Sequence, residues 1–262
     1  MTLLCLKNNE IDTFYAYNLT LKKYSDNLVK CKKTSFMNIK GFCKDNKHTG
    51  TMSFDELEQK TKSYLKKVKT NIIDLAYNNR YDFDYFITLT FDFRGEEYSH
   101  EIAIEKLTKW IDNQKHQNKK MKYILVPEFH KSGRLHFHGL VGGVDTWQLE
   151  IAINPHTNKP IQKNGIQIYN LKKYDLGFTT ISKIKSREKV TCYISKYATK
   201  ELITLKNKKR YWYSRNLKKP TTELDYIDTS LKEYFINNDI TYENTFSTDN
   251  RDIELLNFIL KK

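Results

Sequence analysis

The fold is decided by residues 121–141, which read Met-Lys-Tyr-Ile-Leu-Val-Pro-Glu-Phe-His-Lys-Ser-Gly-Arg-Leu-His-Phe-His-Gly-Leu-Val. Two apolar runs, 121–129 and 135–141, flank a short polar stretch, and this pattern predicts two antiparallel strands joined by a turn. In the second run His136 and His138 alternate with apolar residues. Because side chains two apart on a strand point to the same face, both imidazoles are expected on one side of the sheet.

Two imidazoles on one face suggest a metal site, and a third ligand is expected nearby. Glu128 and His130 share a face of the preceding strand, and the turn brings either one beside the pair. The register is open, since a slip of one residue exchanges the faces, but Glu128 lies deeper in the strand and is favoured. A His–His–carboxylate set accepts Mg²⁺ or Mn²⁺, or else Zn²⁺, and leaves positions open for a phosphate oxygen. The alternative is a pair of half-buried histidines with hydrogen-bond partners.

A second constellation lies downstream, in the run Tyr193-Ile194-Ser195-Lys196-Tyr197-Ala198-Thr199-Lys200. A helix is expected over about 186–202, and positions four apart share a helix face. Tyr193 therefore stacks with Tyr197, and Lys196 with Lys200. A phenol, with a pKa of roughly 10, becomes a plausible nucleophile when a metal ion and an ammonium group stabilise the developing charge. The alternative is a stripe of aromatic core residues.

The composition favours a polyanionic partner. The formal net charge is +14 and the sequence pI is about 9.3, which suits phosphate neutralisation, although a Lys-rich proteome gives the same bias. The 4 cysteines show no C-x-x-C or zinc-finger spacing, as is usual in a reducing cytoplasm. The chain lacks a Walker A pattern and an apolar run of 18 residues, which disfavours an ATP-driven motor and a membrane protein.

The remaining pattern predicts an α+β fold. Three further runs read as strands: 85–91, 166–169 and 178–184. Two more helices are expected: about 55–77 and about 99–114. Ser53 and Glu56 form a capping-box signal, and Asn164-Gly165 reads as a hairpin turn. This order predicts an antiparallel sheet with helices packed on one face.

The C-terminal segment has a different character. Residues 206–219 interleave basic and aromatic side chains, and Arg210, Trp212 and Arg215 are candidate contacts to unpaired DNA. An edge strand whose aromatic side chains pack on the core is an equally good interpretation. An amphipathic helix is expected near 253–260.

Three motifs in this order resemble those of the HUH endonucleases, specifically the rolling-circle replication initiator (Rep) proteins of small phages and plasmids. The strand Phe86-Ile87-Thr88-Leu89-Thr90-Phe91 resembles the first motif. Glu128 with the His136/His138 pair resembles the metal-binding motif, and the tyrosine run resembles the third motif of the two-tyrosine superfamily. The resemblance implies a ferredoxin-like HUH fold with a central antiparallel sheet of about five strands. Three segments are then expected: an N-terminal extension (1–80), the endonuclease core (81–205), and a basic-aromatic segment with a C-terminal helix (206–262).

The resemblance also implies a reaction and its participants. Tyr193 or Tyr197 attacks single-stranded origin DNA, giving a 5′-phosphotyrosyl enzyme and a free 3′-OH, and the other tyrosine serves the later rejoining. Lys196 and Lys200 stabilise charge or protonate the leaving oxygen, and Lys131 and Arg134 are further DNA contacts. A host helicase and polymerase are the expected partners, in the cytoplasm of the host cell and away from membranes.

Three other functions remain open from the sequence. A transposase or mobilisation relaxase with the same HUH chemistry has similar motifs. A single-stranded nucleic-acid binding protein uses the same basic and aromatic residues without catalysis. A metallohydrolase that activates water needs neither tyrosine. Metal-dependent covalent capture of DNA distinguishes the proposed reaction from the last two.

Overall fold

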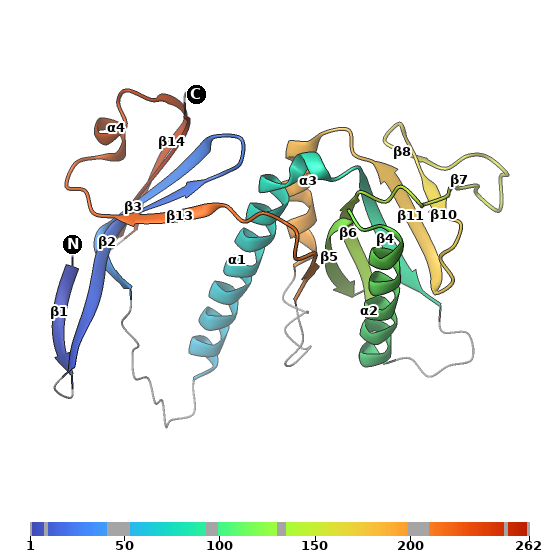
Figure 1. Ribbon diagram of the computed structural model, residues 1–262, viewed down its shortest axis with the longest axis horizontal. Coiled ribbons are helices and arrows are strands. Elements are labelled where there is room, and N and C mark those ends of the chain that lie inside the picture. Colours follow the sequence, from blue (N-terminus) through green and yellow to red (C-terminus); the bar gives the residue numbers. More distant parts are fainter. Residues whose placement is uncertain are drawn as a thin grey trace. The chain divides into compact units, whose positions relative to one another are not determined.

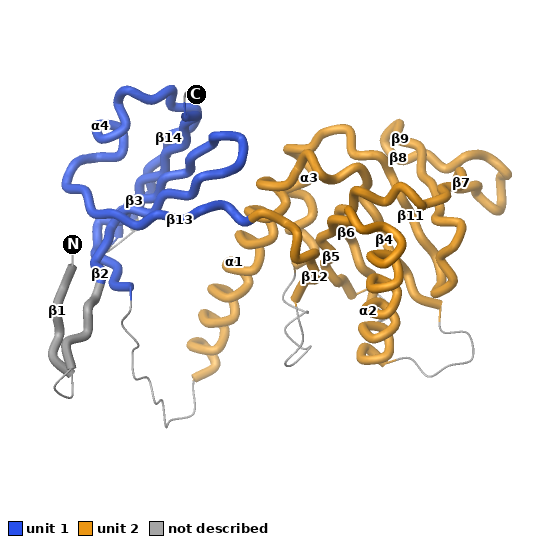
Figure 2. The backbone as a smooth tube through the Cα atoms, in the orientation of Figure 1, with its two compact units in different colours: residues 1–51, 219–262 blue, residues 52–218 orange. Residues whose placement is uncertain are grey.

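The computed structural model (Figure 1) describes residues 2–7, 10–40, 53–92, 99–129, 135–198, 210–248 and 251–260, with side chains from residue 15 onward. The chain forms two compact units (Figure 2), coloured separately. Unit 1 combines residues 1–51 with 219–262, and unit 2 comprises 52–218. The helix expected in an N-terminal extension therefore belongs to the same unit as the three motifs.

Unit 2 is built on a seven-stranded sheet in the order β12-β5-β6-β4-β11-β10-β7, in which every pairing is antiparallel. Its strands are β4 (Tyr85–Phe91), β5 (Lys122–Phe129), β6 (Leu135–Gly142), β7 (Leu149–Ile151), β10 (Tyr169–Leu171), β11 (Gly177–Lys183) and β12 (Trp212–Tyr213). The α+β prediction is confirmed, but the sheet is larger than the expected five strands, because short edge strands extend it on both sides.

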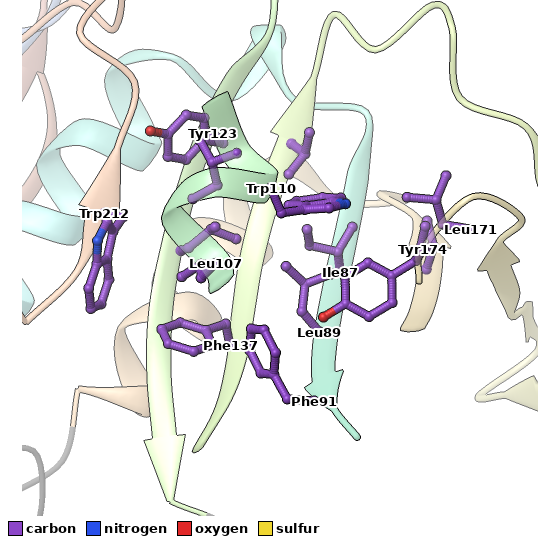
Figure 3. Close-up of a cluster of buried hydrophobic side chains, with 14 of the residues drawn as sticks. Ile87, Leu89, Phe91, Leu107, Trp110, Tyr123, Phe137, Leu171, Tyr174 and Trp212 are labelled. Atoms are coloured by element: carbon purple, nitrogen blue, oxygen red, sulfur yellow. The ribbon is translucent and has the colours of Figure 1, made fainter. Parts of the chain in front are cut away.

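Helices cover both faces of this sheet, not one as expected. The helices of unit 2 are α1 (Phe54–Asn78), α2 (His100–Gln117) and α3 (Arg187–Ile194), with the 3₁₀ turns η1 (Arg80–Asp82) and η2 (Ser195–Tyr197). Leu107 and Trp110 of α2 pack with Leu89 and Phe137 in one cluster, part of which Figure 3 shows. The helices α1 and α3 pack with Leu140 in a second cluster. Because β6 alternates Phe137, His138, Gly139 and Leu140, the histidines face the second cluster.

Local sequence signals account for the helix starts. The Ser53 side chain accepts a hydrogen bond from the Glu56 N–H, and Glu56 accepts one from the Ser53 N–H, so the predicted capping box is present. Ser99 caps α2 in the same way, by accepting from the N–H of Ile102. The predictions of strand 85–91 and of helices near 55–77 and 99–114 are confirmed within a few residues.

A small hairpin stands beside the main sheet. It consists of β8 (Gln162–Lys163) and β9 (Ile166–Gln167), joined by Asn164 and Gly165. These two residues have φ values of 50° and 67°, the left-handed region that favours Asn and Gly in such turns. The predicted hairpin turn is confirmed.

Unit 1 holds a six-stranded sheet in the order β1-β2-β3-β15-β14, with β13 paired to β2. Its elements are β1 (Thr2–Lys7), β2 (Glu10–Lys23), β3 (Leu28–Lys40), β13 (Thr221–Asp225), the short helix α4 (Leu231–Tyr234), β14 (Asp239–Thr248) and β15 (Arg251–Ile259). The C-terminal helix expected near 253–260 is wrong, since this segment is β15. Its partner β3 lies more than 200 residues earlier, with Leu256 opposite Cys31.

The positive charge is concentrated in unit 2. This unit holds 31 of the 45 Lys and Arg residues and 18 of the 31 Asp and Glu residues, and thus +13 of the net +14. The attraction for polyanions is therefore a property of the unit that carries the three motifs. Within the described residues, no helix is long and apolar enough to span a membrane.

Candidate functional site

Strand register in unit 2 places the expected metal ligands on one face. Glu128 on β5 pairs directly with His136 on β6, and His136 pairs with Thr90 on β4. Two residues further along β6, His138 pairs with Thr88. Directly opposed residues of an antiparallel pair share a face, so Glu128 lies on the same side of the sheet as both imidazoles. The register left open by the sequence is therefore the one that favours Glu128.

The side chains of this cluster are in direct contact. His138 Nε2 lies 2.6 Å from Glu128 Oε2, and Nδ1 of the same ring lies 3.0 Å from Thr88 Oγ1. His136 Nδ1 lies 3.1 Å from Thr90 Oγ1. A threonine hydroxyl can donate or accept, so each threonine orients its imidazole in either tautomer.

Both tyrosines lie beside the histidines. Tyr197 Oη donates a hydrogen bond of 2.9 Å to Tyr193 Oη, and the Tyr197 ring stacks on His138 with 3.7 Å between centroids. Phe86 completes the aromatic group, with its centroid 5.5 Å from that of Tyr193 and 6.3 Å from that of Tyr197. The expectation that the tyrosines share a face is confirmed.

The tyrosine segment differs from the expected continuous α-helix. The helix α3 ends at Ile194, and Tyr197 lies in the 3₁₀ turn η2. The two phenols still meet, because the tighter turn keeps residues four apart on neighbouring positions of the same side. Residues 199–202 of the expected helix lie outside the described residues.

The donor set suits a divalent metal ion, although the structure contains no enclosed metal cluster among its described residues. One carboxylate and two imidazoles converge on one face of the sheet, and both Nδ1 atoms lie against threonine hydroxyls. Such outer contacts fix a metal-ligating histidine with its Nε2 available. An ion bound to Glu128 and His138 would replace their 2.6 Å hydrogen bond.

Burial shifts two of the pKa values in this site. Desolvation lowers the pKa of His138, although the neighbouring Glu128 carboxylate opposes this shift. A neutral imidazole is the form that ligates metal ions. Burial also raises the pKa of the Tyr197 phenol, and its contact with Tyr193 and the charge of Glu128 act in the same direction. Tyr197 is therefore held as a neutral phenol in this arrangement.

The lysines of the tyrosine motif are only partly described. Lys196 Nζ lies 5.1 Å from the centroid of the Tyr193 ring. This places one ammonium group beside a phenol, as the sequence predicts. Lys200 lies outside the described residues, and so do Lys131, Arg134 and the alternative ligand His130.

The basic-aromatic segment divides between core and surface. Trp212 is 7 % exposed in β12 and packs edge-on against Phe137, with centroids 5.4 Å apart. The edge-strand interpretation therefore holds there, and the proposed DNA contact of the Trp212 ring is corrected, because a buried indole cannot stack on a base. Arg210 lies over the Tyr64 ring at 6.0 Å. Arg215 is exposed and lines a shallow basic pocket with Lys115 and others.

Sequence reasoning missed the roles of Thr88 and Thr90. Their motif was identified as a core strand only. Their alternation with Ile87 and Leu89 matches the alternation of the histidines with Phe137, and that shared two-residue period was an available signal.

One comparison with known proteins gives a match. Residues 84–202 match a family model described as a replication-associated protein of the ORF2 type. The matched segment runs from just before β4 past η2, and it includes both histidines, Glu128 and both tyrosines, but it covers less than half of the chain. The chain has no match among the curated proteins or the solved structures compared with it. The family match supports a role as a replication initiator that interacts with DNA.

Proposed function

We propose that this protein initiates rolling-circle replication by nicking and rejoining single-stranded origin DNA through a tyrosine nucleophile. The observation that carries this proposal is the contact between the tyrosine pair and the Glu128/His136/His138 cluster. Tyr197 stacks on His138 and bonds to Tyr193, so both phenols lie within one site. The family match over residues 84–202 supports the replication role independently of this geometry.

The proposed reaction is a transesterification. A tyrosine Oη attacks the phosphorus of one phosphodiester, the bond from phosphorus to the 3′ oxygen breaks, and a 5′-phosphotyrosyl bond forms. The phenol loses a proton and the leaving 3′ oxygen gains one, so no oxidant or cosubstrate is consumed. Attack by a 3′-OH on the phosphotyrosine reverses the step and rejoins the strand.

Tyr193 is the better placed of the two phenols for the first attack. Its side chain is exposed, whereas that of Tyr197 is partly buried against His138. Tyr197 donates its hydroxyl hydrogen to Tyr193 Oη, which stabilises negative charge on that oxygen. Lys196, whose ammonium lies beside the Tyr193 ring, is positioned to stabilise charge at the phosphate.

Glu128, His136 and His138 would hold a divalent ion, Mg²⁺ or Mn²⁺. When bound, such an ion supplies a Lewis acid that polarises a phosphodiester oxygen. The residues of the chain supply the orientation: Thr88 and Thr90 fix the two imidazoles from the neighbouring strand.

Covalent capture tests this proposal directly. Purified protein is incubated with single-stranded oligonucleotides that tile its replicon, with Mn²⁺ or with EDTA, and resolved on a denaturing gel. The expected result is a metal-dependent protein–DNA band that survives in one single variant, Tyr193→Phe or Tyr197→Phe, and disappears in the double variant. A band that persists in the double variant would refute the assignment of the nucleophiles. Salt-sensitive binding without any band would favour a non-catalytic single-stranded DNA binding protein.

A further inference from the structure

A groove of about 800 Å³ opens next to Tyr193 and has no part in the chemistry described above. Its walls come from three elements: the β8–β9 hairpin, the end of β11 with the residues that follow it, and α3. Phe86 and Tyr193 belong both to this groove and to the aromatic group beside the histidines. The groove is therefore continuous with the proposed site of strand cleavage.

The lining combines an apolar surface with a basic surround. The apolar contribution includes Phe86, Ile166, Ile168, Ile184 and Val190. The basic side chains are all exposed lysines: Lys163, Lys183, Lys185, Lys189 and Lys196. The carboxylate among the lining residues, Glu188, has its Oε1 atom 3.7 Å from Arg80 Nε. The groove thus presents apolar surface and net positive charge together.

The hairpin wall is held in place by a contact to the opposite side of the groove. Lys185, just after β11, donates a hydrogen bond of 3.1 Å to the carbonyl of Gly165 in the hairpin turn. The charge of Lys163 on the hairpin also contributes to the lowered pKa of His138, so this ammonium acts at the histidine cluster. The hairpin therefore connects the groove with the candidate ligands.

We propose that this groove binds an unpaired nucleotide of the DNA strand, next to the phosphodiester that the tyrosines attack. A nucleotide offers a flat, largely apolar base to the apolar lining and phosphates to the surrounding lysines. Aromatic and apolar side chains stack on bases of any sequence, and lysines that follow the backbone neutralise its charge. A base held in a duplex is stacked and paired on both sides, so its faces are hidden from such a groove. The groove thereby selects single-stranded substrate.

This inference rests on the proposed function for the position of the nucleotide, but its test needs no cleavage. The probe is a fluorescein-labelled dT12 oligonucleotide, titrated with protein in EDTA and followed by anisotropy at several salt concentrations. Two variants change the lining: Ile166→Glu places a carboxylate on the apolar surface, and Lys189→Glu reverses one charge on α3. Lys159→Glu is the matched control, because it makes the same charge reversal at an exposed residue outside the groove lining.

The expected result is a loss of affinity of about tenfold for Ile166→Glu, in line with the loss of one stacked base. Lys189→Glu should reduce the slope of log affinity against log salt by about 0.7 or more, the value for one phosphate contact on a single strand. The control should bind within about twofold of the unaltered protein. Circular dichroism melting verifies that each variant is folded, so that a misfolded Ile166→Glu leaves Lys189→Glu as the deciding variant.

The outcomes separate the two proposals. If folded groove variants bind dT12 as tightly as the control, the groove proposal is overturned, even when the unaltered protein forms the covalent adduct. If they bind weakly but the unaltered protein forms no adduct with any oligonucleotide, the groove proposal stands and the nicking proposal fails. Equal affinity of the unaltered protein for dT12 and for a twelve-base-pair duplex would also overturn the proposed selection for unpaired DNA.

Discussion

The substitution Thr88→Val tests whether the first motif supports the histidine cluster. Valine has nearly the shape of threonine and suits a β-strand equally well, so β4 should keep its pairing with β6. The change removes one hydroxyl, whose oxygen lies 3.0 Å from His138 Nδ1. The perturbation is thus confined to one hydrogen bond of one imidazole.

The expected magnitude follows from that contact. The His138 side chain is only 12 % exposed, so water does not readily replace the lost partner of Nδ1. An unsatisfied group of this kind costs about 1–3 kcal/mol of the free energy of unfolding. Loss of such an outer contact to a metal-ligating histidine typically costs about 10–100-fold in metal affinity or activity. We expect a moderate loss of stability and a large increase in the Mn²⁺ concentration that half-saturates adduct formation.

The assay is a titration of covalent adduct against Mn²⁺ at a fixed oligonucleotide concentration, with metal affinity measured separately by calorimetry. Thr180→Val on β11 is the matched control. Thr180 pairs directly with Thr88, so it lies on the same face one strand further from His138. It is exposed on that face and makes the same chemical change at a distance from the imidazole.

The result that would refute the reasoning is a Thr88→Val protein whose half-saturating Mn²⁺ concentration equals that of Thr180→Val. The hydroxyl would then have no role in holding the imidazole. Thr90→Val provides an independent repeat, since Thr90 Oγ1 lies 3.1 Å from Nδ1 of His136. An effect in Thr88→Val alone would restrict the support to His138.

Three further predictions concern stability and metal dependence. Gly139→Ala should lower the free energy of unfolding in urea by about 1–3 kcal/mol or more, because the added Cβ would lie 2.3 Å from Leu125 Cδ2 and 2.7 Å from the carbonyl oxygen of Ile124. Asn79→Ala should cost about 1–3 kcal/mol in the same assay, since the buried amide bonds the backbone of both Leu75 and Lys218. EDTA should abolish adduct formation, and added Mn²⁺ should restore it on the same gel.

The sequence predicted the central part of unit 2 well, because local signals and global pairing agree there. The run 85–91 is β-branched and aromatic, and it forms β4 with the predicted bounds. The capping box at Ser53 marks the start of α1 within one residue. In such segments each local preference supports the same element, which makes single-sequence reasoning reliable.

The errors occur where distant pairing decides the structure. The segment 251–259 has apolar residues at spacings that fit a helix, yet it pairs with β3 and β14 as a strand. Unit 1 joins both ends of the chain, and its core places Leu19 and Val29 with Leu256 and Phe258. No local signal announces a partner more than 200 residues away, so long-range strand pairing overrides the helical pattern.

The candidate site was predicted in its residues and only partly in its geometry. The shared face of His136 and His138 follows from strand alternation alone, and the structure confirms it. The position of Glu128 needed the register between β5 and β6, which a turn outside the described residues connects. The burial of Trp212 required knowledge that β12 adds to the edge of the sheet at Leu125, a contact between residues far apart in the sequence.

The two-residue spacing of the threonines and that of the histidines are one constraint seen on two strands. In an antiparallel pair, residues i and i+2 of one strand face residues j and j−2 of its neighbour, so an H-x-H pattern needs a T-x-T pattern opposite. A slip of one residue between β4 and β6 would bring Ile87 and Leu89 to the imidazoles and leave both Nδ1 atoms against hydrocarbon. The same slip would expose those apolar side chains on the face of the histidines. The register that buries the core is therefore also the register that orients the site.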